Sequence, residues 1–169
     1  MQHIIVLRGA PATGKTTLAK AMRSDDLKIA WLKIDAFKDI FERETEKNLH
    51  LVNGLGITTL THLLNLGYSV VVDGIFQDTS RIDEIQTLAR ERTIPCTVFQ
   101  LQTEYQTLQT RDLEREKESL GLRKRLSEET LKRLFDKVAG SVYPGAILLD
   151  TENKTVSECL AFINSHLKS

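Results

Sequence analysis

The stretch Gly9-Ala10-Pro11-Ala12-Thr13-Gly14-Lys15-Thr16 decides the fold, because it fits the phosphate-binding loop pattern G-x-x-x-x-G-K-[ST] at every fixed position. An apolar run, residues 4–7, precedes it, and a helix-forming run, residues 17–22, follows it. A buried strand that turns through glycines into a helix directs several backbone N–H groups at one point, where the helix terminus adds roughly half a positive charge. This geometry suits the β-phosphate of a nucleoside triphosphate. The alternative is a glycine turn with an incidental lysine.

The loop predicts where the phosphates and a metal ion would bind. We expect the Lys15 ammonium to contact the β- and γ-phosphates and the Thr16 hydroxyl to bind Mg²⁺. The expected ligands are therefore ATP and Mg²⁺. The nucleotide should contact Gly9, Ala10, Pro11, Ala12, Thr13, Gly14, Lys15, Thr16 and Thr17.

The composition is that of an ordinary globular protein, and 169 residues suggest one domain, residues 1–169, with a sizeable core. Lys plus Arg total 23, as do Asp plus Glu, so no overall basic field favours nucleic acid or a membrane surface, although a local groove stays open. Cys96 and Cys159 have no metal or redox spacing and are expected to be reduced thiols. The first apolar run is too short for a signal peptide, and no stretch approaches membrane-spanning length, so we expect a cytoplasmic protein.

Strand-like and helix-like segments alternate along the chain. Expected strands cover residues 3–8, 29–34, 68–72, 96–101 and 146–149, and expected helices cover 15–23, 36–45 and 52–66, the last ended by Gly67. Later helices should start at Ser127 and at three residues with capping-box spacing, namely Ser80 with Asp83, Thr103 with Gln106, and Thr155 with Glu158. This alternation predicts an α/β fold, in which a parallel sheet carries helices on both faces and binds ligands at the carboxyl ends of its strands.

Two aspartates end the second and third expected strands and should therefore flank the phosphate loop. Asp35 is the candidate base for an attacking hydroxyl, and Asp73 is the candidate for the Mg²⁺ shell, through water. The alternatives are that Asp35 caps the next helix and that Asp73 is a turn aspartate before Gly74. Lys38 lies one helical turn past Asp35 and either faces the same acceptor site or is a solvated lysine. All three side chains are candidates for contact with the acceptor.

A highly charged segment, residues 111–126, is the candidate for a mobile lid over the nucleotide. Arg111 and Arg115 are four residues apart, so they share one face of a helix, from which they could stabilise the charge of a transferred phosphoryl group. The alternative is an exposed helix whose charges form surface ion pairs of little energetic value.

With these residues in place, the chain resembles the small P-loop kinases of the group that includes chloramphenicol phosphotransferase, zeta toxins and the polynucleotide 5′-kinase domain. The shared pieces are the loop from Gly9 to Thr16, the strand that ends in Asp35, the Val-Val-Asp-Gly-Ile-Phe segment at 71–76, and the arginines at 111 and 115. Residues 31–35 and the tail from 149 to 159 look most like the chloramphenicol phosphotransferase branch.

The resemblance implies a three-layer sandwich whose five parallel strands run in the order 2-3-1-4-5. It also implies that Asp35 is the catalytic base for the acceptor hydroxyl and that a lid arginine, here Arg111, packs near adenine. Polynucleotide kinases carry a phosphate-neutralising arginine where this chain has Lys38. The acceptor pocket is expected within residues 36–56.

We therefore expect an ATP- and Mg²⁺-dependent kinase that transfers the γ-phosphoryl group to a hydroxyl of a small molecule. The rivals are a polynucleotide 5′-hydroxyl kinase, a zeta-toxin-like nucleotide-sugar kinase, and a nucleotide-binding module without turnover. The balanced net charge disfavours the first of these, because nucleic-acid binding usually shows a basic footprint.

Overall fold

A computed structural model describes residues 1–25, 28–41, 46–118 and 125–167. Within these residues a five-stranded parallel sheet has the order β2-β3-β1-β4-β5. Its strands are β1 (Ile4–Arg8), β2 (Ile29–Lys33), β3 (Ser69–Gly74), β4 (Cys96–Gln102) and β5 (Ile147–Asp150). The parallel sheet confirms the architecture that the alternating pattern predicts, and the strand order confirms the one that the resemblance implies.

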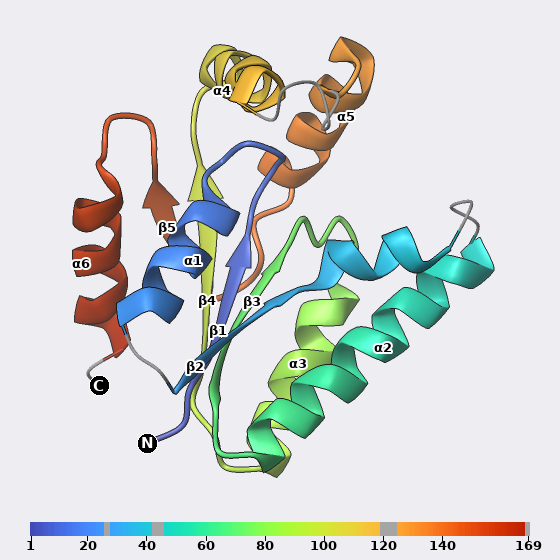
Figure 1. The fold of residues 1–169 in the computed structure, drawn as a ribbon, viewed down its shortest axis with the longest axis vertical. Coiled ribbons are helices and arrows are strands. Elements are labelled where there is room, and N and C mark those ends of the chain that lie inside the picture. The colour runs from blue at the N-terminus through green and yellow to red at the C-terminus, as the bar shows by residue number, and fades with distance from the viewer. Residues whose placement is uncertain (26–27, 42–45, 119–124, 168–169) are drawn as a thin grey trace.

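Helices cover both faces of the sheet, which gives the expected three layers (Figure 1). One face carries α1 (Lys15–Asp25) and α6 (Val156–Leu167), and the other carries α2 (Glu46–Asn65) and α3 (Ser80–Glu91). The remaining two, α4 (Tyr105–Glu118) and α5 (Glu128–Ala139), lie beyond the carboxyl ends of the strands. None of the described helices is both long enough and apolar enough to span a bilayer.

The core is split into two clusters by the sheet itself. In β1, Ile4 and Val6 belong to the cluster under α2 and α3, whereas Ile5 and Leu7 belong to the cluster under α1 and α6. Successive strand residues point to opposite faces, so a strand buried on both faces must be apolar at every position. This explains why β1, the central strand, and its neighbour β3 read as almost continuous apolar runs.

The helix expected over residues 36–45 is wrong in type and extent. The structure instead has a 3-10 helix, η1 (Ile34–Ile40), after which Phe41 is extended with φ −108° and ψ 138°; residues 42–45 lie outside the described part of the chain. Ile34 and Phe37 are three residues apart and both pack on the core, as the three-residue turn of a 3-10 helix allows.

The next helix starts earlier than expected. The apolar periodicity begins at Val52, but α2 begins at Glu46 and extends through polar residues. Its end agrees with the prediction, because Gly67 has a φ of 86°. Its N–H donates to the Leu64 carbonyl (3.0 Å), and the Tyr68 N–H donates to the Leu63 carbonyl (3.2 Å), which is a Schellman motif.

Two of the four later helix starts match the expected caps. The Thr155 hydroxyl accepts from the Glu158 N–H (3.2 Å) and the Glu158 carboxylate accepts from the Thr155 N–H (2.8 Å), so these residues form a capping box. The Ser127 hydroxyl accepts from the Thr130 N–H (3.2 Å).

The other two starts differ from the prediction. Thr79, not Ser80, is the N-cap of α3, and Asp83 accepts a hydrogen bond from the Tyr143 hydroxyl (2.6 Å). The α4 helix begins at Tyr105, and the Thr103 hydroxyl donates to Glu152. In both cases a side chain whose spacing predicts a capping role instead forms a hydrogen bond with a residue far along the chain.

Candidate active site

The phosphate loop joins β1 to α1, and its backbone conformation depends on two glycines. Gly14 has a φ of 96°, a conformation that a side chain would strain. A Cβ at Gly9 would lie 2.6 Å from the Thr13 hydroxyl and 3.1 Å from the Leu101 carbonyl oxygen. The first glycine is therefore required by close packing and the second by its backbone angle.

Lys15 is buried at the first position of α1 and folds back onto the loop. Its Nζ donates to the carbonyl oxygens of Gly9 (2.9 Å) and Ala10 (2.7 Å). Burial lowers the pKa of Lys15 to about 8, against the opposing effect of the Asp73 and Asp35 carboxylates. This ammonium is thus held by two neutral carbonyl groups near two acidic side chains.

Thr16 and Asp73 are in direct contact across the site. The Thr16 hydroxyl donates to Oδ2 of Asp73 over 2.7 Å, and the sheet register places Asp73 between Leu7 of β1 and Lys33 of β2. A hydroxyl beside a carboxylate oxygen is a donor set that Mg²⁺ prefers. Within the described residues no group of three His, Cys, Asp or Glu side chains could hold a metal, so water and phosphate oxygens would have to complete such a shell.

Asp35 lies in the first turn of η1, directly after β2, and accepts a hydrogen bond from the backbone N–H of Ile75. Burial raises the pKa of Asp35, while the charges of Lys38 and Lys15 act in the opposite direction. In a 3-10 helix, residues three apart are eclipsed, so Asp35 and Lys38 share one face of η1. The structure thus brings Asp35, Asp73, Lys15 and Lys38 to the same edge of the sheet.

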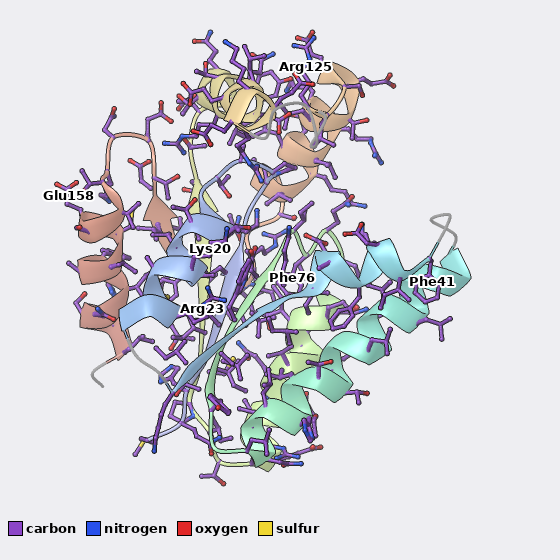
Figure 2. The ribbon with its side chains drawn as sticks, in the orientation of Figure 1. Lys20, Arg23, Phe41, Phe76, Arg125 and Glu158 are labelled. Atoms are coloured by element: carbon purple, nitrogen blue, oxygen red, sulfur yellow. The ribbon has the colours of Figure 1, made fainter. Side chains whose placement is uncertain are left out.

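The turn after β3 holds the two carboxylates in place and is strained. A Cβ at Gly74 would lie 2.8 Å from the ring of Phe76, and Phe76 itself has a φ of 48°. A bulky residue in this left-handed region costs about 1–3 kcal/mol and persists only where its surroundings fix it. Phe76 packs between the sheet and η1 in Figure 2, as part of the core cluster that includes Ile34.

Arg111 lies on the opposite side of the loop from Asp35. Its Nη2 donates to the Thr151 carbonyl (2.7 Å) in the connection between β5 and α6, and the Thr151 hydroxyl lies 3.1 Å from the carbonyl oxygen of Thr13. The charge of Arg115 is among those that lower the pKa of Lys15. Arg111 therefore lies at the β5 end of the loop, whereas the charge of Arg115 acts on Lys15.

The expected lid, residues 111–126, is described in part, because residues 119–124 lie outside the described chain. In the part that precedes these residues, Asp112 is buried, and its Oδ2 accepts a hydrogen bond from the Leu126 N–H (2.9 Å). The Arg125 N–H donates to Glu116 (3.3 Å). The far end of the segment is thus tied back to α4.

A cavity of about 670 Å³ lies beside the loop on its β4–β5 side. Ala10 and Thr13 line it from the loop, and Glu104, Phe135 and Glu152 line it from the surrounding elements. Glu152 accepts hydrogen bonds from the Thr103 and Thr107 hydroxyls and from the Glu104 N–H, which together hold its pKa at about 2. An ionised carboxylate therefore faces this side at neutral pH.

Sequence reasoning missed Arg8, which is fully buried in β1 directly before the loop. Its Nε donates to the Phe76 carbonyl (3.1 Å), its Nη1 to Oε1 of Gln100, and its Nη2 to the Ser141 hydroxyl (2.8 Å). Burial lowers the pKa of Arg8. The available signal was a charged residue that ends an otherwise apolar strand, but nothing local identified its partners.

Comparison with solved structures finds the same fold in several proteins. At a TM-score of 0.73 and 14% identity, the chain resembles the APS kinase of Mycobacterium tuberculosis, solved with AMPPNP and APS, covering 99% of this chain and 98% of that one. The Deinococcus radiodurans tunicamycin resistance protein matches at 0.70 and 14%, over 99% and 96% of the two chains. A gluconokinase from Sinorhizobium meliloti 1021 matches at 0.68 and 15%, over 98% and 95%. At these identities the likeness establishes the fold alone.

The sequence itself gives the family. No curated protein matches the chain. The sequence profile described as an AAA domain matches residues 4–140, which include the phosphate loop, both aspartates and both arginines. The chain therefore belongs to the AAA domain family.

Proposed function

We propose that this protein is an ATP- and Mg²⁺-dependent kinase that transfers the γ-phosphoryl group of ATP to a hydroxyl of a small-molecule acceptor. The observation that carries the proposal is the convergence of Lys15, the Thr16–Asp73 pair and the half-buried Asp35 at one edge of the sheet. A nucleotide-binding site alone has no need of a second carboxylate with a raised pKa.

The phosphate loop would bind ATP, the phosphoryl donor. Lys15 would exchange its contacts with Gly9 and Ala10 for the β- and γ-phosphate oxygens, and backbone N–H groups at the start of α1 would hold the β-phosphate. Thr16 and Asp73 would hold Mg²⁺, which neutralises phosphate charge when bound. Arg111, at the β5 end of the loop, would contact the nucleoside.

The 3-10 helix η1 carries the residues that would act on the acceptor hydroxyl. A carboxylate oxygen of Asp35 accepts the proton of the acceptor hydroxyl, the hydroxyl oxygen bonds to the γ-phosphorus, and the bond from that phosphorus to the β–γ bridging oxygen breaks. ADP leaves with that bonding electron pair. Lys38 and Arg115 would neutralise charge that spreads over the transferred group.

The acceptor pocket is proposed within residues 36–56, which include most of η1 and the first half of α2. Phe37 and Phe41 follow Asp35 on this segment and are partly buried against the core. Aromatic walls next to a candidate base fit a neutral hydroxyl compound of the kind phosphorylated by chloramphenicol phosphotransferase. In this proposal residues 1–169 act as one cytoplasmic domain, with 111–126 as the lid.

The test is a screen for acceptor-dependent ADP release and for transfer of labelled γ-phosphate. Antibiotics, nucleosides, sugars, nucleotide-sugars and a 5′-hydroxyl oligonucleotide are offered, each with the parent protein and with Asp35→Asn. Labelling of a small hydroxyl compound by the parent alone supports the proposal. Labelling of the oligonucleotide instead identifies a polynucleotide kinase, and tight ATP binding without transfer to any acceptor identifies a non-catalytic nucleotide-binding module.

A further inference from the structure

A buried guanidinium whose described hydrogen-bond partners are all neutral comes directly before the phosphate loop. Arg8 is 0% exposed, and its described hydrogen-bond partners are the carbonyl, amide and hydroxyl oxygens of Phe76, Gln100 and Ser141. Burying a charge without an opposite charge is unfavourable, and an apolar residue of similar size would fill the same space at lower cost. The presence of arginine therefore points to a task other than filling the core.

The three partners come from three separate parts of the chain. Phe76 is in the turn after β3, Gln100 is in the middle of β4, and Ser141 follows the end of α5. Gln100 is itself fixed, since its Oε1 also accepts from the Tyr143 N–H (3.1 Å) and its Nε2 donates to the Val138 carbonyl (3.3 Å). The planar guanidinium fork thus joins the loop's own strand to the turn on one side and to α5 on the other.

We propose that Arg8 is a positioning residue that fixes the turn from Asp73 to Phe76 relative to the phosphate loop. Its contact is with the carbonyl of Phe76, the residue with the left-handed backbone. One residue before it, the Ile75 N–H donates to the Asp35 carboxylate, and three residues before it, Asp73 accepts from Thr16. One guanidinium contact therefore holds the turn whose Ile75 N–H binds the Asp35 carboxylate, directly after the strand that carries Asp73.

Arg8 touches neither of these carboxylates, so it acts through the turn rather than on the reacting groups. The effect of Arg8 on the turn does not depend on the proposed kinase function, whereas an effect on turnover rests on that function. The contact with Ser141 also ties the turn to the end of α5, the helix that follows the expected lid.

The test compares Arg8→Met, which keeps the length of the side chain, and Arg8→Lys, which keeps its charge but not the fork, with the parent. The control is Ile163→Ala in α6, a fully buried position in the other core cluster. Amide hydrogen exchange of Ile75 and of Val71, in the middle of β3, is followed by NMR on ¹⁵N-labelled protein.

In both Arg8 variants we expect the Ile75 amide to exchange on the order of tenfold faster, relative to Val71, than in the parent. In the control, exchange of Ile75 should not become faster relative to Val71, because a loss of core packing acts at least as strongly on the core amide. If the Arg8 variants change Ile75 and Val71 in proportion, or leave both unchanged, Arg8 only stabilises the core and the inference is wrong. Should Arg8→Met not fold, Arg8→Lys alone decides between these outcomes.

Once an acceptor is known, the same variants give a second readout. We expect kcat to fall about tenfold while the ATP dissociation constant stays within about threefold of the parent, because the loop still binds phosphate while Asp35 is less well placed. A raised ATP dissociation constant with an unchanged kcat would contradict the positioning role. If no acceptor is ever phosphorylated, the kinase proposal fails while the exchange measurement still decides the role of Arg8.

Discussion

The two sides of the phosphate loop are built from different kinds of interaction. On the β2–β3 side, Lys15, Asp35 and Asp73 are charged groups held close together, and burial shifts the pKa of both Lys15 and Asp35. On the β4–β5 side, Arg111 and Thr151 bind mainly to backbone carbonyl oxygens. On the β2–β3 side, burial thus shifts the pKa of groups that lie where a proton and a phosphoryl group would move. On the β4–β5 side, where a nucleoside would be held, the ionised Glu152 carboxylate is held by hydroxyl and backbone N–H donors.

This difference predicts that substitutions on the two sides have different kinetic effects. Removal of a charge on the β2–β3 side should lower kcat, because those groups interact with charge that develops during transfer. Removal of a contact on the β4–β5 side should raise the KM for ATP, because those groups bind a part of the donor that does not react.

The largest effect is expected for Lys15→Ala. The substitution removes the ammonium that would bridge the β- and γ-phosphates, and phosphoryl transfer should fall by roughly 10³-fold or more. Transfer is measured with labelled ATP and the acceptor identified by the screen. Lys20→Ala, an exposed lysine on the same helix, is the matched control and should stay near the parent rate.

Asp35→Asn is expected to lower transfer by about 10²-fold, the usual scale for a general base, while ATP affinity is retained. Affinity is measured by titration with nucleotide and transfer by the labelled assay. Asp39→Asn changes an exposed aspartate on the same 3-10 helix and should have little effect. Equal rates for Asp35→Asn and the parent would show that Asp35 is not the base.

The contrast between the two sides also explains what could be predicted from the sequence. The proximity of Asp35 and Asp73 could be predicted from the sequence, because the carboxyl ends of parallel strands meet at one edge of the sheet. Gly67 and the Thr155–Glu158 pair could be assigned because caps involve residues only a few positions apart. Each of these inferences needs only local spacing and one topological rule.

The features that escaped prediction depend on residues far apart in the chain. Arg8 binds Gln100 and Ser141, 92 and 133 positions away, and no local pattern shows these contacts. Asp83 has capping-box spacing to Ser80 but binds Tyr143 instead. The early start of α2 is invisible to hydrophobic periodicity, because its first turn is polar.

The pH dependence should separate the two charged partners on the β2–β3 side. Asp35 must be ionised to accept a proton, so kcat/KM should rise with pH through a pKa above the ordinary aspartate value, and Asp35→Asn should remove this acid limb. Lys15 must be protonated, so kcat/KM should fall about tenfold per pH unit once the pH exceeds the Lys15 pKa of about 8. Bound phosphates stabilise the ammonium, so the alkaline limb of kcat should lie at higher pH than that of kcat/KM. Coincident alkaline limbs would show that Lys15 does not contact the phosphates.

The smallest effect is expected on the other side, for Arg111→Ala. The variant loses hydrogen bonds to the Thr151 carbonyl and hydroxyl, and with them the proposed contact to the nucleoside. The lower end of the range for a charge-assisted hydrogen bond, about 1.5 kcal/mol, corresponds to roughly tenfold, so the KM for ATP should rise by about that factor while kcat changes little. Arg133→Ala, an exposed arginine on α5, controls for the loss of one positive charge. A fall in kcat at unchanged KM would place Arg111 with the reacting groups, and the division between a reactive side and a binding side would then be wrong.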